Sequence, residues 1–118
     1  MNNSNTSTQM RKGIIEFSVL LLLSRGRIYP TEVIQMLEEA GLSLKEATVY
    51  TVLNRLKKEE KVSYEWVESV KGPPRKYFRI TPQGMEALKE ASESWQQIEY
   101  TINYLRNKYR HNTNETDH

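Results

Sequence analysis

The stretch SLKEATVYTVLNRLKKEEK, residues 43–61, decides the fold. Val49, Val52, Leu53 and Leu56 are spaced three and four residues apart, which predicts an α-helix that buries one apolar face. The opposite face is polar and basic, with few carboxylates. It is either an ordinary solvated helix surface or a binding surface, and the neighbouring segments decide between these two interpretations. That face is centred on Ala47, Thr51, Asn54 and Lys58, and it is flanked by Thr48, Tyr50, Arg55 and Lys61.

The start of this helix is marked by its own sequence. Ser43 and Glu46 have the spacing of a capping box, in which the serine accepts a hydrogen bond from the amide three residues on and the glutamate reaches back. Leu42 and Ala47 have the spacing of a hydrophobic staple. The pattern predicts a helix from Ser43 to about Glu60.

The upstream segments predict a helix-turn-helix. A helix over about Pro30–Ala40 begins with a proline, which suits the first helical position, and ends at Gly41. Two helices joined by a short turn, the second with a basic outer face, are typical of the motif that places its second helix in the DNA major groove. A first helix, about Met10–Ser24, is apolar almost all round and belongs at the centre of the core.

Two runs with high strand propensity follow, Val62–Glu68 and Arg75–Ile80. The residues between them include a glycine and two prolines, so we expect an antiparallel hairpin with a stiff tip. Lys71 lies near this tip, and Arg75 and Lys76 begin the return strand. A basic hairpin after a helix-turn-helix is typical of a winged helix-turn-helix, although an ordinary surface hairpin is the alternative.

The segment Thr81–Tyr109 predicts one long helix, with Thr81 as its N-cap and Pro82 at the first helical position. Its apolar residues alternate at spacings of three and four, which is the period of a helix that packs along another helix. At ~1.5 Å per residue the helix is ~40 Å long, more than a domain of this size covers by itself. We therefore expect a second copy of the chain to cover a dimer interface of Leu88, Ala91, Trp95, Ile98, Ile102, Leu105 and Tyr109.

Trp95 is the unusual member of this interface, because two-stranded coils prefer Leu, Ile or Val at such positions. One interpretation is that the indole fills a core. The other is that it forms an aromatic surface at the dimer interface, available to a flat ligand or to its symmetry mate.

The composition excludes several classes of function. The 118 residues suit one small domain and include no cysteine, so disulfides and thiolate metal sites are excluded. The two histidines, His111 and His118, lie in a polar tail, so we expect no metal site. The rest of the chain has no Gly-rich phosphate loop, so we expect that the protein binds no cofactor and is not an enzyme. Glu16 interrupts the apolar run 14–23, which is also too short to span a bilayer, so we expect a soluble, cytoplasmic protein.

The formal net charge of +2 is unevenly distributed. Residues 45–61 carry five basic and three acidic side chains and residues 62–79 carry four and two, whereas residues 82–118 carry four and six. The excess positive charge therefore falls on the second helix of the helix-turn-helix and on the hairpin. This distribution predicts a polyanion-binding surface there.

Two motifs resemble the PadR family of bacterial repressors. They are Ala47-Thr48-Val49-Tyr50, continuing through Leu53, Arg55 and Leu56, and Gly72-Pro73-Pro74-Arg75-Lys76-Tyr77. The order of the expected elements, from Met10 to Tyr109, is also similar to that of the family. The single C-terminal helix and its Glu93-Ser94-Trp95 resemble the short subfamily, which includes a lactococcal multidrug regulator.

The predicted fold class is α+β, mainly α: a winged helix-turn-helix with a long C-terminal dimerisation helix. We expect residues 10–81 to form the DNA-binding domain and residues 82–110 to form the dimerisation helix. The polar ends, 1–9 and 111–118, lack apolar periodicity, and we expect both to be disordered.

The predicted function is that of a homodimeric DNA-binding transcriptional regulator, a repressor that recognises a pseudo-palindromic operator. A winged-helix module that binds protein and not DNA is the alternative. The residues expected to contact DNA are Lys45, Thr48, Tyr50, Thr51, Asn54, Arg55 and Lys58 in the helix and Lys71, Arg75 and Lys76 in the hairpin.

The resemblance to the multidrug regulator implies, in addition, a slot at the dimer interface for a small planar aromatic or drug-like effector. Glu99 would face a cationic ligand there. The residues implied for this slot are Met10, Ile14, Phe17, Trp95, Ile98 and Glu99.

Overall fold

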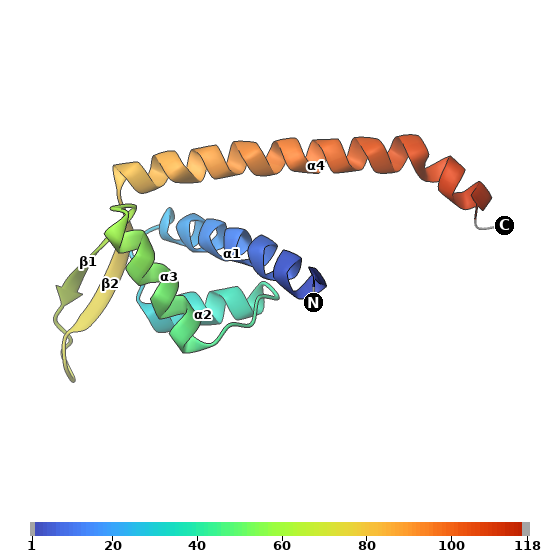
Figure 1. Ribbon diagram of the computed structural model, residues 1–118. Coiled ribbons are helices and arrows are strands. Elements are labelled where there is room, and N and C mark those ends of the chain that lie inside the picture. The colour runs from blue at the N-terminus through green and yellow to red at the C-terminus, as the bar shows by residue number, and fades with distance from the viewer. Residues whose placement is uncertain (1, 117–118) are drawn as a thin grey trace. The chain divides into compact units, whose positions relative to one another are not determined.

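The computed structural model describes the backbone of residues 2–116 and the side chains of residues 9–110. The chain forms two compact units, Met1–Leu88 and Lys89–His118. Mainly helical structure with a small antiparallel sheet and a long C-terminal helix confirms the predicted fold class (Figure 1). The elements, in order, are α1 (Asn2–Leu23), α2 (Pro30–Glu39), α3 (Glu46–Lys58), β1 (Val62–Val67), β2 (Arg75–Ile80) and α4 (Pro82–Thr116).

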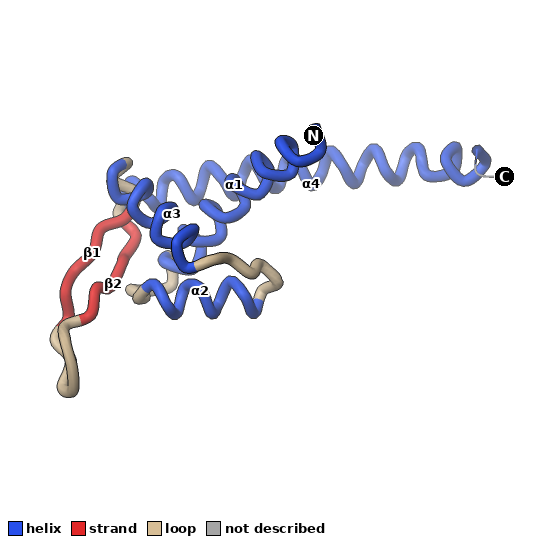
Figure 2. The backbone as a smooth tube through the Cα atoms, turned by 60° about the horizontal axis from the view of Figure 1, so that its bottom comes forward, coloured by secondary structure: helices blue, strands red, loops and turns tan. Residues whose placement is uncertain are grey.

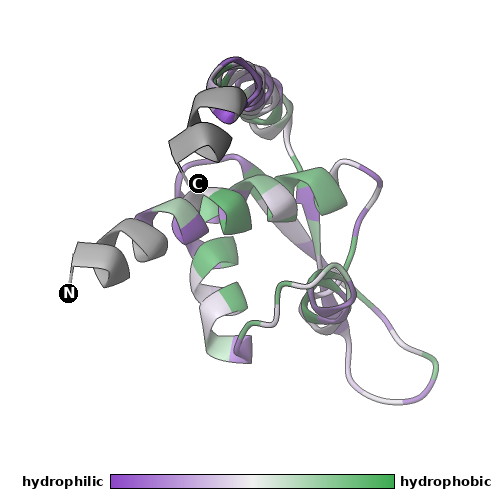
Figure 3. Ribbon diagram, turned by 90° about the vertical axis from the view of Figure 1, so that its right-hand side faces the viewer, coloured by the Kyte–Doolittle hydropathy of each residue, from purple (hydrophilic) through white to green (hydrophobic). Residues whose placement is uncertain are grey.

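Helix α1 lies at the centre of the first unit, where it contacts α2, α3 and β2. Val19 and Leu23 of this helix are at most 1% exposed, as expected for a helix that is covered on several sides. Figure 3 shows the half of α1 that enters the core in the green of hydrophobic residues. The α3 residues that the sequence predicts to be buried are all in this core: Val49, Val52, Leu53 and Leu56.

The capping box predicted at Ser43 is wrong. Helix α3 begins at Glu46, and its N-cap is Lys45, whose side chain makes no capping hydrogen bond. Leu42 and Leu44 pack against the core, and this packing keeps the chain out of the helix until Glu46. The turn depends instead on the glycine after α2, because Gly41 has a φ of 93°, in the left-handed region that favours glycine.

Strands β1 and β2 pair antiparallel, with Tyr64 opposite Phe78 and Trp66 opposite Lys76. Phe78 is 1% exposed and also pairs through its backbone with Ile28, so the base of the hairpin is fixed to the segment before α2. Figure 2 shows the two strands in red, with the loop that joins them extending beyond α1, α2 and α3. The hairpin is therefore anchored at its base and accessible at its tip.

The first turn of α4 is fixed to the segment between α3 and β1. Thr81 caps this helix as predicted: its Oγ1 accepts a hydrogen bond from the amide of Gly84 at 3.0 Å and donates one to the carbonyl of Glu60 at 2.7 Å. The amide of Thr81 donates to the carbonyl of Lys61 at 3.1 Å. A Cβ atom at Gly84 would collide with that carbonyl oxygen and lie 2.6 Å from Cγ1 of Ile80.

Glu16 ties α1 to the end of α3. Its carboxylate pairs with Arg55 at 3.0 Å and with Lys61 at 3.4 Å. The hydrogen bond from Lys61 to Glu59 raises the pKa of that lysine, and Glu16 raises it further, whereas partial burial opposes both. The residue that interrupts the apolar run of α1 therefore serves as an ionic contact between two helices.

Helices α1 and α4 extend further than the sequence predicts, to Asn2 and Thr116. Helical backbone therefore runs into both ends, 1–9 and 111–118, that the composition predicts to be disordered. Neither end contains a proline or a glycine, the two residues least favourable within a helix. Most of their side chains lie outside the described residues.

The close contact at Gly84 predicts that Gly84→Ala lowers the free energy of unfolding by about 1–3 kcal/mol, the usual cost of forcing an extra methyl group into a packed site. Urea unfolding followed by circular dichroism measures this. The matched control is Gly13→Ala, because a Cβ at Gly13 of α1 meets nothing within 4 Å. This control should leave the midpoint unchanged or raise it. A wild-type midpoint for Gly84→Ala would contradict the packing described for this turn.

Candidate nucleic-acid interface

The outer face of α3 carries exposed polar groups, because the apolar residues on its other side fix the rotation of the helix. Thr51, Asn54 and Lys58 are exposed on this face. The hydroxyl of Thr51 donates to the carbonyl of Ala47 at 2.9 Å, so its oxygen remains available as an acceptor. Within the described residues, the side-chain amide of Asn54 makes no hydrogen bond, which leaves both its NH₂ donor and its oxygen acceptor for a base edge.

Arg55 and Thr48 lie at the edge of this face and are partly buried. The guanidinium of Arg55 pairs with Glu16 at 3.0 Å, so a contact with a phosphate requires exchange of that carboxylate. Both residues line a cavity of ≈ 260 Å³ between α1 and α3, together with Lys12 of α1. Lys12 is not among the residues that the sequence predicts to contact DNA. The periodicity of α3 does not indicate which residues of α1 lie beside α3.

The predicted cations of the hairpin occupy different environments. Lys71 is exposed in the loop. The Cζ atom of Arg75 lies 5.1 Å from the centre of the Tyr29 ring, and the Nζ atom of Lys76 lies 4.0 Å from the centre of the Tyr64 ring. None of the three forms an ion pair within the part of the chain that the structure describes. Aromatic rings therefore hold two of the cations in place without neutralising them.

Two other cations near the hairpin, Arg79 of β2 and Arg27 of the segment before α2, are neutralised instead. Arg27 and Arg79 both contact the carboxylate of Glu65, at 3.0 Å and 3.6 Å. Arg27 also lies over the ring of Tyr77, 5.2 Å from its centre. The uncompensated charge of the hairpin is therefore concentrated in the loop and at the start of β2.

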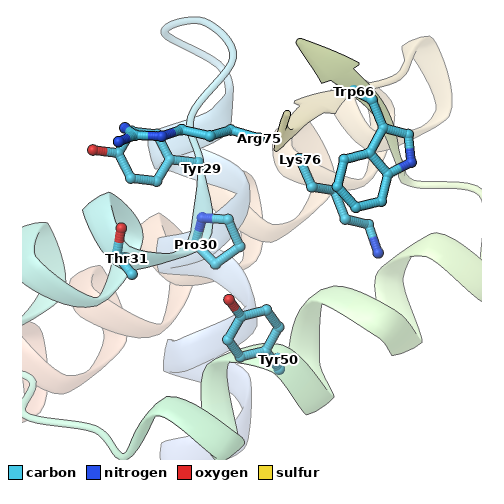
Figure 4. A pocket seen from close by; sticks show the side chains of 7 residues that line it. All are labelled: Tyr29, Pro30, Thr31, Tyr50, Trp66, Arg75 and Lys76. Carbon is cyan, nitrogen blue, oxygen red and sulfur yellow. The ribbon is translucent and has the colours of Figure 1, made fainter. Parts of the chain in front are cut away.

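A cavity of ≈ 610 Å³ lies between the start of α2, α3 and the hairpin (Figure 4). Trp66, which is 64% exposed, forms part of its wall. The sequence-based set missed Trp66 and also Lys57, whose Nζ atom lies 4.9 Å from the centre of the Tyr64 ring. The side chains that line the cavity are Tyr29, Pro30, Thr31, Tyr50, Trp66, Arg75 and Lys76.

The residues of the predicted dimer interface fall into two groups. Leu88 is only 8% exposed and belongs to the core of the first unit, so it is not available to a second chain. Ala91 is partly buried. In the second unit, 43–52% of the surface is exposed for Trp95, Ile98, Ile102, Leu105 and Tyr109.

The residues implied for the effector slot are divided between the two units. Met10 of α1 is 64% exposed, and Ile14 and Phe17 of the same helix are partly buried. Trp95, Ile98 and Glu99 are exposed on α4 in the second unit.

Residues 19–90 match the transcriptional regulator PadR-like family, which confirms the resemblance seen in the sequence motifs. The X-ray structure of a PadR-like transcription factor from Bacteroides fragilis is 44% identical, with a TM-score of 0.75 over 86% of this chain and 98% of that one. A PadR-like transcriptional regulator from Bacillus cereus is 33% identical, with a TM-score of 0.73 over 82% of this chain and 95% of that one.

A curated protein from Lysinibacillus sphaericus is 30% identical over 94 residues, which cover 77% of this chain and 86% of that protein. The family match extends from α1 into α4 and so includes the whole helix-turn-helix and the hairpin. Members of this family are transcriptional regulators and not enzymes. The chain belongs to the transcriptional regulator PadR-like family.

Proposed function

We propose that the chain is a homodimeric repressor that binds a pseudo-palindromic DNA operator through α3 and the hairpin. The main support for this proposal is that Thr51, Asn54 and Lys58 are exposed on the outer face of α3, opposite its buried apolar face. A helix with such a face fits the major groove, which is ~12 Å wide. A dimer bound across an operator excludes other proteins from that DNA, and repression follows.

The side chains proposed to contact DNA divide into those that read bases and those that bind phosphates. Asn54 reads a base, because its amide offers the donor and acceptor pair that matches the edge of an adenine. Lys45, Lys58 and Lys71 bind phosphates, which fix the position of the protein on the duplex. Arg55 joins them when a phosphate replaces Glu16 as its partner.

The apolar stripe of the second unit supports a dimer. Ile98, Ile102 and Leu105 are spaced three and four residues apart, and 43–52% of the surface of each is exposed. Soluble monomers rarely leave a continuous apolar stripe open to water. Pairing of two stripes covers them and brings two copies of α3 onto one duplex, ~34 Å apart for successive major grooves.

A module that binds protein is the alternative, and the charge of the surface favours DNA. The exposed centre of α3 and the hairpin loop carry Lys58 and Lys71 without a carboxylate partner in the described chain. Such uncompensated charge attracts the phosphate backbone.

Lys71→Ala is expected to reduce the slope of log affinity against log salt by about one, with an unchanged preference among sequences, because one phosphate contact is lost.

Asn54→Ala should instead weaken binding to the preferred site by about 1–3 kcal/mol and affect random DNA little, because a contact to a base is lost. Fluorescence anisotropy with fragments selected from the source genome measures both.

The charge-matched control for Lys71→Ala is Lys89→Ala, which removes an exposed lysine from α4. It should leave the slope as in the wild type. If Lys71→Ala also leaves the slope unchanged, the hairpin does not contact DNA. If the wild-type protein enriches no discrete fragment at ~0.15 M salt, the protein-binding alternative holds.

We further propose that a planar aromatic effector binds between the Trp95 side chains of two copies and releases the DNA. The support is the 43% exposure of this indole within the apolar stripe. Glu99, one helical turn further along α4, supplies a charge for a cationic ligand. Release requires that the ligand bind more tightly to the arrangement of the dimer that does not fit the operator.

Titration with the planar cation proflavine tests the effector site. In a Trp66→Phe protein, Trp95 is the remaining tryptophan, and its fluorescence should fall in a saturable manner. Glu99→Gln should weaken this binding about tenfold, since it removes the charge that faces the cation. Equal quenching of wild-type and Trp95→Ala proteins, through Trp66, would contradict a site at Trp95.

A further inference from the structure

We infer that the cavity between α2, α3 and the hairpin receives one strand of the DNA sugar–phosphate backbone. We name this cavity the aromatic notch, after Tyr29, Tyr50 and Trp66, which line it together with Pro30, Thr31, Arg75 and Lys76. In this arrangement Trp66 packs on a deoxyribose, and Arg75 and Lys76 bind the adjoining phosphates. The inference rests on the proposed DNA-binding function and assigns to Trp66 a contact that the sequence motifs do not indicate.

Trp66 is held in place with much of its surface uncovered. It lies on the same face of the hairpin as Tyr64, whose ring meets the indole edge to face at 6.5 Å and 89°. The indole is nevertheless 64% exposed, and Figure 4 shows it at the rim of the notch above Lys76. A positioned aromatic ring with an open surface suits an apolar partner that has a polar edge, such as a sugar.

The charge of the notch is positive and uncompensated. None of the seven side chains that line it is acidic. Lys76 and Lys57 both lie over the Tyr64 ring, at 4.0 Å and 4.9 Å from its centre, and Arg75 lies over the ring of Tyr29. Because ring contacts and not carboxylates hold these cations, a phosphate can pair with them without displacing an internal partner.

The position of the notch matches the path of a DNA strand beside α3. Tyr50, which forms one side of the notch, precedes the outward-facing Thr51 directly in the helix. A helix in the major groove has one phosphate strand on each side. The notch lies on one side of α3, and the cavity with Lys12 and Arg55 lies on the other, so a basic hollow is present for each strand.

A strand of DNA accounts for this surface better than a free nucleotide does. The volume of ≈ 610 Å³ is sufficient for a small ligand. However, further cations without an ion pair in the described chain lie outside the notch, namely Lys57 and Lys58 on α3 and Lys71 in the loop. A single nucleotide in the notch would leave these cations unpaired, whereas a polyanion extends far enough to pair with cations outside the notch as well.

The test measures the fluorescence of Trp66 while a DNA duplex that contains the selected site binds to the protein. In a Trp95→Phe protein, Trp66 is the remaining tryptophan. Its fluorescence should change on binding, and its quenching by acrylamide should fall at least about twofold, because the backbone covers the exposed indole. In the otherwise unchanged chain, Trp66→Ala should weaken binding to specific and random duplexes alike by about tenfold. The salt dependence should stay as in the wild type, since no charge is removed.

Tyr100→Ala is the matched control. Tyr100 is 67% exposed, much as Trp66 is, but it lies on α4 in the second unit, and its replacement should leave the affinity unchanged. Trp66→Tyr should retain most of the affinity, because a smaller ring still packs on the sugar. Circular dichroism of each variant confirms that the substitution has not unfolded the protein.

Each contrary outcome has a distinct meaning. If the duplex binds tightly while Trp66 remains accessible to acrylamide and Trp66→Ala binds like the wild type, the inference is overturned and the proposed function stands. If no duplex binds the wild-type protein, both are overturned. If deoxyadenosine monophosphate alone at millimolar concentration protects Trp66 and displaces the duplex, the notch is a site for free nucleotides and the strand proposal is overturned.

Discussion

The contact between the apolar face of α3 and the core around α1 is the interaction on which the rest of this protein depends. Val49, Leu53 and Leu56 are fully buried there, and each such side chain contributes about 1.5–3 kcal/mol to folding. A rotation of α3 by one residue, ~100°, would bury polar groups in place of these three. The core therefore determines that Asn54 and Lys58 face outward. The surface proposed to read DNA is a direct consequence of hydrophobic packing.

The cations of the first unit serve two purposes, and their partners distinguish them. Arg27, Arg79 and Lys61 pair with carboxylates of other elements, Lys61 with Glu16 of α1 and the two arginines with Glu65 of β1. Arg75 and Lys76 are held by aromatic rings, which fix their positions and leave their charge available to a ligand. In a chain whose formal net charge is only +2, this division concentrates attraction for a polyanion on α3 and the hairpin.

The sequence was sufficient to predict the elements and the outward face of α3, because periodicity and caps are local signals. Thr81 shows this, since its capping role depends on the amide of Gly84 three residues on. Contacts between distant residues were not predictable in the same way. The start of α3 depends on how Leu42 and Leu44 pack on the core, and the ion pair of Arg55 depends on Glu16 in another helix.

Leu88 and Trp66 show two further limits of sequence patterns. The apolar period of α4 runs without a break through Leu88, yet this residue is in the core of the first unit, because periodicity does not reveal which partner covers each position. The strand propensity of Val62–Glu68 predicted β1 but did not indicate that a cavity borders Trp66. The candidate site therefore needed the three-dimensional arrangement, whereas the fold class did not.

We expect two copies of this PadR-like chain to associate through the apolar stripe of α4 and to read one operator together. Sedimentation equilibrium at micromolar concentration, with and without the selected duplex, measures whether the chain is a dimer. The expected result is a dimer in both cases for the wild type and single chains for Ile102→Glu, which places a charge within the stripe. Single chains for the wild type, with and without DNA, would contradict the proposed dimer.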